Sequence, residues 1–277
     1  MTDRVAIVTG GLRGLGRGMT LGLAKSGVRV LAVGHLPEDV AAIEGTSNVR
    51  AMVADLRSPA ECDRVVTEAL SAFGRIDILV NNAGLTFTYI DPDRFRREKP
   101  RKFWEVGDEV VQNVMATNYV AADQMGRRVA SILVRQGSGR IVNVTTKLDT
   151  MNKEGSLPYG SSKAALEMAT EVWAKEVAGT GVTVNIVNPG AGANTPGMNQ
   201  EMRDWSREGR APRLVEPDEM VPPLLYLVST AADNVNGYRF DALTWDVSLP
   251  PAEAARRNGR PAGFVLHPQD ESAFPAQ

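Results

Sequence analysis

The chain has 277 residues, of which 43% are hydrophobic and 23% are charged, and its formal net charge at pH 7 is −2. This length can bury one large core, and the charge gives no support to a nucleic-acid surface or an anionic-membrane surface. Cys62 is the only cysteine, which excludes an intrachain disulfide and favours a reducing compartment. Residues 1–8 lack a signal-peptide pattern and no run is long enough to span a bilayer, so we expect a cytoplasmic protein. No metal site is predicted.

Short apolar runs alternate with longer helical patterns along the chain. The expected strands are residues 4–9, 28–33, 49–54, 76–81, 140–145 and 182–187. The expected helices are residues 14–26, 59–73, 108–136 and 158–178. The alternation predicts an α/β fold, a Rossmann-like doubly wound parallel sheet in a single domain, with ligands bound beyond the carboxyl ends of the strands.

A glycine-rich turn follows the first expected strand. It reads Thr9-Gly10-Gly11-Leu12-Arg13-Gly14-Leu15-Gly16, and a helical pattern resumes directly after it. Glycines let the backbone approach a pyrophosphate, and the start of a helix offers free amide groups and the positive end of a dipole. A plain glycine-rich turn is the alternative, but the strand–turn–helix context favours a dinucleotide cradle.

Polar and small residues stand at the ends of the later strands. Asp55-Leu56 after the third strand can hold an adenine edge or serve as an ordinary turn, and Asn81-Asn82-Ala83-Gly84 after the fourth lets a flat ring lie close to the backbone. Thr145 and Thr146 follow the fifth strand, and Asn188-Pro189-Gly190 forces a change of direction after the sixth. Because parallel strands end at one edge of a sheet, these residues predict one ligand cleft.

The segment Tyr159-Gly160-Ser161-Ser162-Lys163 lies at the start of the last expected helix. Tyr159 and Lys163 are one turn apart on one face, and an ammonium beside a phenol favours the phenolate, so Tyr159 can exchange a proton near neutral pH. Such pairs occur on many helices, and the glycine turn upstream makes this one informative. Asn118 lies inside the 108–136 helix, where an Asn distorts the helix, holds water or is merely solvated.

These motifs closely resemble those of the classical short-chain dehydrogenase/reductase family. The matches, in the family's order and over residues 4–242, are Thr9-Gly10-xxx-Gly14-Leu15-Gly16, Asp55, Asn81-Asn82-Ala83-Gly84, Asn118, Tyr159-xxx-Lys163 and Asn188-Pro189-Gly190. The resemblance implies a nicotinamide-dependent oxidoreductase that acts on a ketone or secondary alcohol, in a catalytic domain at 1–242 followed by an extension at 243–277. It also implies a homodimer or homotetramer paired through the two long helices. The alternative is a non-catalytic nicotinamide sensor or partner-binding protein of the same fold, which typically lacks the Tyr or the Lys.

The resemblance implies a role for each catalytic residue. Tyr159 is the general acid in carbonyl reduction and the base in alcohol oxidation, Lys163 holds the nicotinamide ribose and lowers the pKa of Tyr159, and Asn118 anchors a water that relays protons to Lys163. The hydroxyl that orients the substrate carbonyl, usually a Ser, is here Thr146, while Thr145 is expected to point to the other side of its strand. The implied cofactor-binding residues are Thr9, Gly10, Leu12, Arg13, Gly14, Leu15, Gly16, Gly34, His35, Asp55, Leu56, Asn82, Ala83, Gly84, Tyr159, Lys163, Pro189, Gly190, Asn194 and Thr195.

The residues after the second strand bear on the choice of nicotinamide. NAD-preferring relatives carry an Asp where this chain has Gly34, which is followed by His35, and the first carboxylate is Glu38. Arg13 in the glycine turn is placed to pair with a 2′-phosphate, although it can also be an ordinary solvated residue. We therefore predict NADP, with NAD as the second choice.

Three segments depart from the family pattern. The insertion at residues 85–107 has a charged stretch that can recognise an anionic substrate or a partner chain, although a solvated loop is favoured. In the segment after Gly190 the usual Thr stands one residue late, so Asn194 and Thr195 share the role of holding the nicotinamide carboxamide. Its small residues predict a mobile lid, and the expected pocket walls are Met198, Met202 and Trp205.

The tail after residue 242 either closes the pocket, crosses to another subunit or packs on the surface as a partly disordered end. His267 is a catalytic candidate only if the tail enters the site. Because all three variable segments shape the pocket, the sequence leaves the substrate open beyond a small-molecule carbonyl or alcohol.

Overall fold

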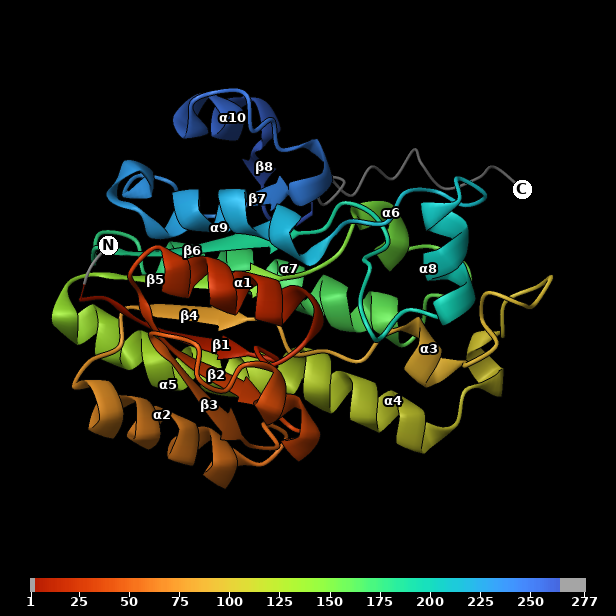
Figure 1. Ribbon diagram of the computed structural model, residues 1–277, viewed down its shortest axis with the longest axis horizontal. Helices are drawn as coiled ribbons and strands as arrows, with labels where there is room; N and C mark the ends of the chain where they lie inside the picture. The colour runs from red at the N-terminus through yellow and green to blue at the C-terminus, as the bar shows by residue number, and fades with distance from the viewer. Residues whose placement is uncertain (1–2, 265–277) are drawn as a thin grey trace, which may run out of the picture.

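The computed structural model describes residues 3–264, so the expectation for His267 lies outside the described residues. One sheet in the order β3-β2-β1-β4-β5-β6-β7-β8 forms its centre (Figure 1). The strands are β1 Val5–Thr9, β2 Arg29–Gly34, β3 Val49–Val53, β4 Ile78–Asn81, β5 Gly139–Val144, β6 Val182–Asn188, β7 Tyr238–Asp241 and β8 Arg260–Pro261. Strands β1 to β7 pair in parallel, and β8 pairs antiparallel with β7. The predicted α/β fold with a parallel Rossmann-like sheet is confirmed.

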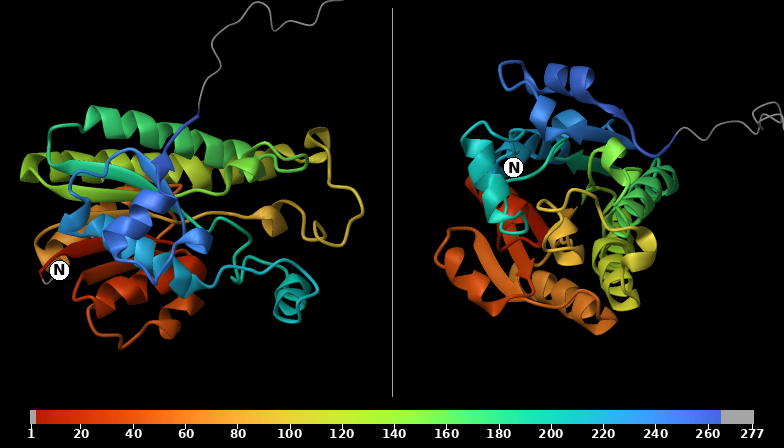
Figure 2. Two further views of the ribbon diagram at one scale, coloured as in Figure 1. Left: turned by 90° about the horizontal axis from the view of Figure 1, so that it is seen from above. Right: turned by 90° about the vertical axis from the view of Figure 1, so that its right-hand side faces the viewer.

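Helices cover both faces of this sheet (Figure 2). They are α1 Gly14–Lys25, α2 Pro59–Phe73, α3 Phe87–Ile90, α4 Asp108–Met115, α5 Ala121–Gln136, α6 Leu148–Met151, α7 Tyr159–Glu176, α8 Gln200–Arg207, α9 Val221–Val228 and α10 Pro251–Asn258. Successive side chains of a strand point to opposite faces of the sheet, so the hydrophobic core is divided into two layers. Ala6 and Val8 of β1 pack on the side of α1 and α9, whereas Ile7 packs on the side of α2, α5 and α7. No helix within residues 3–264 is long and apolar enough to cross a membrane.

The expected helix at 108–136 is interrupted. A π-helical turn, Ala116–Val120, separates α4 from α5, and Asn118 lies at its centre with no solvent exposure. Turns of this kind occur inside α-helices, frequently at functional sites. The hydrophobic pattern continues through the turn, so periodicity alone does not reveal it.

Helices α8, α9 and α10 are not among the predicted elements. Helix α9 begins Val221-Pro222-Pro223 and is buried on most sides, so its sequence lacks a polar face that would reveal a 3.6-residue pattern. Helix α10 begins at Pro251, directly after Pro250. Proline is well tolerated in the first turn, where an amide has no intrahelical partner. Each pair of adjacent prolines therefore marks the start of a helix.

The first part of the tail packs against the sheet. The Trp245 ring lies 5.8 Å from the Tyr226 ring and 6.1 Å from the Phe240 ring, centroid to centroid. The Asn258 side chain accepts a hydrogen bond from the Asp241 amide at 2.9 Å and donates to the Asp241 carbonyl at 3.0 Å. Residues 243–264 therefore follow the surface-packed alternative.

Candidate active site

A cavity of about 540 Å³ opens at the carboxyl ends of the strands. Its walls come from the glycine turn, the residues after β4, β5 and β6, the insertion and the lid. The predicted site residues that line it are Gly10, Arg13, Gly14, Leu15, His35, Asn82, Ala83, Gly84, Thr146, Tyr159, Lys163, Pro189 and Thr195. The predicted site residues outside its lining are Thr9, Leu12, Gly16, Gly34, Asp55, Leu56, Asn118, Gly190 and Asn194.

Tyr159 is the first residue of α7 and is half-buried in this cavity. Its ring lies 4.7 Å from the Phe87 ring, centroid to centroid, so the insertion packs directly against the phenol. Burial raises the pKa of Tyr159, and a side-chain hydrogen bond with Thr146 opposes that rise. The raised pKa keeps the phenol protonated at neutral pH. The role of Lys163 in lowering this pKa stays a prediction.

Lys163 is 4% exposed and stands one helical turn after Tyr159. Its Nζ donates a hydrogen bond to the Val144 carbonyl at the end of β5, at 2.8 Å. Burial lowers the pKa of Lys163 to about 8 from 10.5. The ammonium is therefore directed to the strand end rather than to the phenol. Gly84 borders the same space, since a Cβ at this position would lie 3.4 Å from Nζ.

The Asn118 side chain joins the insertion to α7. Its Oδ1 accepts a hydrogen bond from the Leu85 amide at 2.7 Å. Its Nδ2 donates hydrogen bonds to the Leu85 carbonyl and to Ser162 Oγ, each at 3.0 Å. These contacts fix the start of the insertion beside the helix that carries Tyr159. The role of Asn118 in holding a proton-relay water stays a prediction.

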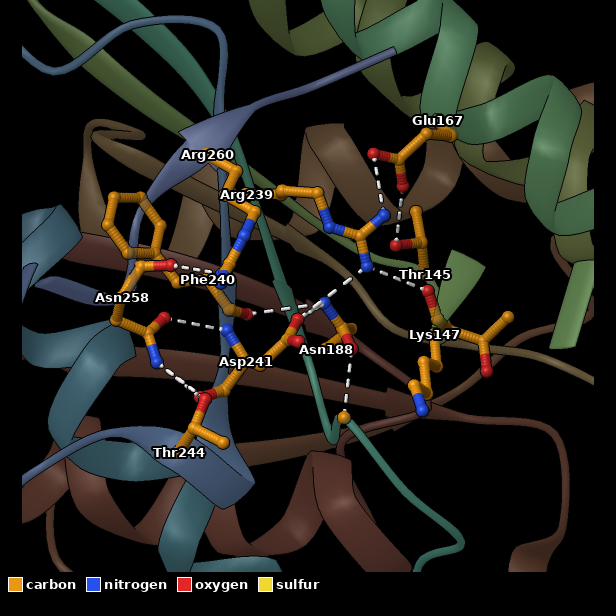
Figure 3. Close-up of polar contacts among 12 residues, drawn as sticks. Thr145, Lys147, Glu167, Asn188, Arg239, Phe240, Asp241, Thr244, Asn258 and Arg260 are labelled. Atoms are coloured by element: carbon orange, nitrogen blue, oxygen red, sulfur yellow. Dashed lines mark hydrogen bonds and ion pairs between the residues drawn. The ribbon is translucent and has the colours of Figure 1, made fainter. Parts of the chain in front are cut away.

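A buried ion pair between Glu167 and Arg239 contacts Thr145 (Figure 3). Thr145 Oγ1 donates to Glu167 of α7 at 2.9 Å, and Arg239 of β7 lies 3.0 Å from the same carboxylate. Arg239 also donates to the Thr146 carbonyl at 3.0 Å. The Thr145 hydroxyl is thus engaged by Glu167, although Thr145 also lines the cavity, and its expected orientation away from the site stays a prediction. Glu167 and Arg239 were missed, because charged residues on a helix and a strand carry no local signal of burial.

Replacing Glu167 with Gln is expected to lower the free energy of unfolding by about 3 kcal/mol. Glu167 is 0% exposed, and the change would leave the Arg239 guanidinium buried with only the more distant Asp241 carboxylate, at 3.6 Å. Urea denaturation measures the loss. Glu253→Gln, which removes an exposed pair with Arg257 one turn along α10, is the control and should change stability by about 0.5 kcal/mol or less. Equal losses in both variants would contradict the role given to the buried pair.

The glycine turn fits the phosphates of a dinucleotide. Gly10 and Gly14 have φ angles of +62° and +54°, and a Cβ on Gly16 would lie 2.0 Å from the Gly10 carbonyl oxygen, so side chains are excluded there. Asn82 Nδ2 donates to the Thr9 carbonyl at 2.9 Å, which ties the turn to the end of β4. Helix α1 begins without a side-chain cap and without an acidic residue in its first turn, so its positive end faces the cavity unneutralised.

Two polar residues expected to contact the cofactor are engaged elsewhere. The Asp55 carboxylate is bound by Arg57 at 2.6 Å, and this hydrogen bond lowers the pKa of Asp55. Asn194 Nδ2 donates to the Glu216 carboxylate at 2.8 Å, whereas Thr195 lines the main cavity and packs beside Gly14. Of Asn194 and Thr195, the structure therefore leaves Thr195 in the cavity.

The insertion and the lid are bonded to each other. The hydroxyls of Thr86 and Thr88 donate to the Gly197 carbonyl at 2.8 Å and 2.6 Å. Among the charged residues of the insertion, Asp91 is buried and lies 2.9 Å from Arg97, so the solvated-loop interpretation is wrong for this residue.

The lid supplies two of the three expected pocket walls. Met198 and Met202 line the cavity, whereas Trp205 packs under Arg210 with 5.7 Å from the guanidinium carbon to the ring centroid. Trp205 was therefore wrongly expected in the cavity wall. Opening and closing of the lid stays a prediction.

The fold and this cavity define a nicotinamide-dependent oxidoreductase, and the chain belongs to the short-chain dehydrogenase/reductase family, whose model (short chain dehydrogenase) matches residues 4–207. The chain is similar to 2-dehydro-3-deoxy-D-gluconate 5-dehydrogenase of Escherichia coli K12, with 34% identity over 252 residues that cover 86% of this chain and 93% of that protein.

Solved structures agree with this assignment. The chain is similar to 3-ketoacyl-(acyl-carrier-protein) reductase from Brucella melitensis complexed with NADH, at 28% identity and a TM-score of 0.74, covering 87% of this chain and 96% of that one. It is also similar to a variant of actinorhodin polyketide ketoreductase with NADPH, at 27% identity and a TM-score of 0.71, covering 84% and 93%.

Proposed function

We propose that this protein transfers a hydride between NADP and a ketone or secondary alcohol, with Tyr159 as the general acid and base. The observation that carries the proposal is the meeting of Tyr159, Thr146 and Lys163 in the cavity that the glycine turn also borders. When bound, the nicotinamide supplies or accepts the hydride. The protein residues supply position, charge and the proton.

The contacts of Tyr159 and Thr146 support the roles given to them. Tyr159, kept protonated by burial, donates its proton to the carbonyl oxygen in reduction and takes one back in oxidation. Thr146 is hydrogen-bonded to Tyr159 and orients the same oxygen, so two donors stabilise the alkoxide that develops. Lys163 holds the nicotinamide ribose, and Thr195 holds the carboxamide.

Support for NADP comes from the residues beside the glycine turn. Gly34 and His35 at the end of β2 offer no carboxylate to a ribose, and Arg13 and His35 both line the cavity. Arg13 Nε lies 3.6 Å from Asp39, a partner that positions the guanidinium but also competes with a phosphate. The two similar structures contain NADH and NADPH respectively, so this choice rests on the chain's own residues.

Arg13→Ala is expected to weaken NADPH binding roughly tenfold to hundredfold while NADH binding changes little, because a hydrogen bond to a charged group contributes about 1.5–3 kcal/mol. Parallel fluorescence titrations with NADPH and NADH measure both affinities. Arg17→Ala removes an equal charge from the exposed side of α1, outside the cavity lining, and is the control. Equal losses for the two cofactors would refute the phosphate role.

A Gly34→Asp exchange is a poorer test of the same idea. A Cβ at position 34 would lie 2.7 Å from Leu12 Cδ1, and Leu12 is 1% exposed. The substitution therefore disturbs the packing beneath the glycine turn as well as the cofactor preference.

We also keep the proposal of a homodimer or homotetramer paired through α4–α5 and α7. Exposed valines on these helices support it: Val111, Val120, Val134 and Val172 are each 37–43% exposed. A cytoplasmic location remains part of the proposal.

A further inference from the structure

The cavity lining is strongly basic in a chain whose net charge is −2. Its cationic side chains are Arg13, Arg94, Lys153, Lys163 and Arg213, and its one carboxylate, Glu154, is paired with Lys102. Composition does not explain this excess, so it is a property of the site. A cleft lined by one sign of charge concentrates ligands of the opposite sign.

Three of the five cations have a local partner. Arg13 lies beside Asp39, Arg213 is paired with Glu219 at 2.6 Å, and Lys163 is bonded to a strand carbonyl. Within residues 3–264, Arg94 and Lys153 have no acidic side chain within 4.0 Å. These two are the cations of the lining that remain available to a ligand.

Arg94 also stands apart from its neighbours in the insertion. Arg96 is paired with Glu201 at 2.9 Å, Arg97 is paired with Asp91 and Lys102 is paired with Glu154. The Arg94 Nε is buried and has no hydrogen-bond partner in the described part of the chain. A buried donor without a partner costs free energy, and an anionic ligand would satisfy it.

Both cations lie on cavity walls that are formed by segments other than the glycine turn. Arg94 belongs to the insertion, which reaches the reacting centre through the contact of Phe87 with Tyr159. Lys153 belongs to the segment just before α7, six residues ahead of Tyr159. Two segments that are distant in sequence thus place positive charge on the same cavity, apart from the glycine turn that fits the cofactor phosphates.

We propose that Arg94 and Lys153 bind an anionic group of the substrate, so that the natural substrate is a ketone or secondary alcohol bearing a carboxylate or a phosphate. This inference rests on the proposed function, since it concerns the substrate of the same site. The planar guanidinium of Arg94 can pair with two oxygens of such a group, and Lys153 adds a flexible point charge. Anchoring the anion would leave the carbonyl carbon free to be positioned at Tyr159.

Matched substrate pairs test the proposal. Wild-type protein with NADPH is assayed with 4-oxopentanoate against its methyl ester, and with dihydroxyacetone phosphate against dihydroxyacetone. We expect the charged member of at least one pair to have a kcat/KM higher by roughly tenfold to hundredfold, the range of one or two hydrogen bonds to a charged group. The first pair reports a carboxylate and the second a phosphate. Equal values within both pairs would overturn the proposal.

Variants test the residues. Arg94→Gln and Lys153→Gln should each raise KM for the charged compound with little change for its neutral partner, and Arg94→Lys should recover part of the loss. Lys99→Gln is the matched control, because Lys99 lies on the same insertion, is exposed and does not line the cavity. A KM that rises equally in the control would point to the overall charge of the protein and overturn the assignment to Arg94 and Lys153.

A binding measurement separates this inference from the proposed function. Calorimetric titration of the NADPH complex with succinate and with inorganic phosphate needs no turnover. Binding that Arg94→Gln abolishes supports the anion site even if no ketone reacts, in which case the proposed function fails alone. Turnover of neutral ketones without binding of either anion refutes the anion site and leaves the proposed function standing.

Discussion

Tyr159→Phe is expected to lower turnover by roughly 10²- to 10⁴-fold, the contribution typical of a positioned general acid. The change removes one hydroxyl and keeps the ring that packs against Phe87 at 4.7 Å. Cofactor affinity and stability should therefore be nearly unchanged. Steady-state assays with a reducible ketone, together with an NADPH titration, separate the two effects.

Tyr89→Phe is the matched control for this experiment. Tyr89 lies on α3, two residues after Phe87, and does not line the cavity. Its hydroxyl accepts a hydrogen bond from Asn113 at 2.9 Å. It should retain full activity. If Tyr159→Phe kept more than about a tenth of the wild-type rate, Tyr159 would not be the proton donor, since general acids contribute roughly 10²-fold or more.

Lys163→Met is expected to reduce turnover by roughly 10²-fold or more while it stabilises the fold at neutral pH. Burial lowers the pKa of Lys163 from 10.5 to about 8, which corresponds to a cost on the order of 3 kcal/mol when the ammonium stays charged. Loss of the hydrogen bond to the Val144 carbonyl offsets about 1 kcal/mol of the gain. A net stabilisation of about 2 kcal/mol remains.

The stability difference between Lys163→Met and wild type should depend on pH. Between pH 8 and 10.5 the unfolded chain keeps a proton on Lys163 that the folded chain has lost, so wild-type stability rises with pH across this window. The advantage of Lys163→Met is therefore largest below pH 8 and shrinks towards pH 10.5. Denaturant unfolding at a series of pH values measures it.

Lys175→Met is the control for stability. Lys175 lies on the same helix with 72% of its side chain exposed, so its removal should give no comparable gain at any pH. A Lys163→Met variant that is less stable than wild type at pH 7 would show that the buried ammonium contributes more through its contacts than it loses by dehydration.

The raised pKa of Tyr159 and the lowered pKa of Lys163 have one main cause, the burial of both groups, which disfavours their charged forms. The sequence-based argument considered the charge of Lys163 but not this burial, whose effect on the pKa of Tyr159 is opposite in sign. A protonated phenol is the form required of an acid, so the proposed reduction is compatible with the raised pKa.

The parts of the fold and site that the sequence predicted depend on local order along the chain. The β–α alternation predicts a parallel sheet. The glycine turn is recognisable because positive φ angles such as those of Gly10 and Gly14 favour glycine, and Tyr159 and Lys163 share a face because a helix repeats every 3.6 residues. These properties arise within about twenty residues, so the sequence by itself determined the fold class and the family, and it supplied the residues to which the proposed catalytic roles are given.

Only the tertiary structure decided which polar groups are free to meet a ligand. Asp55 is engaged by Arg57 and Asn194 by Glu216, while Glu167 meets Arg239 across 72 residues of chain. Arg94 keeps no acidic partner within residues 3–264, although charged residues surround it in the sequence. Ion pairs and burial depend on distances between segments that folding brings together, and the order of residues does not specify those distances. The availability of Arg94, on which the proposed anion site depends, is therefore a property of long-range packing.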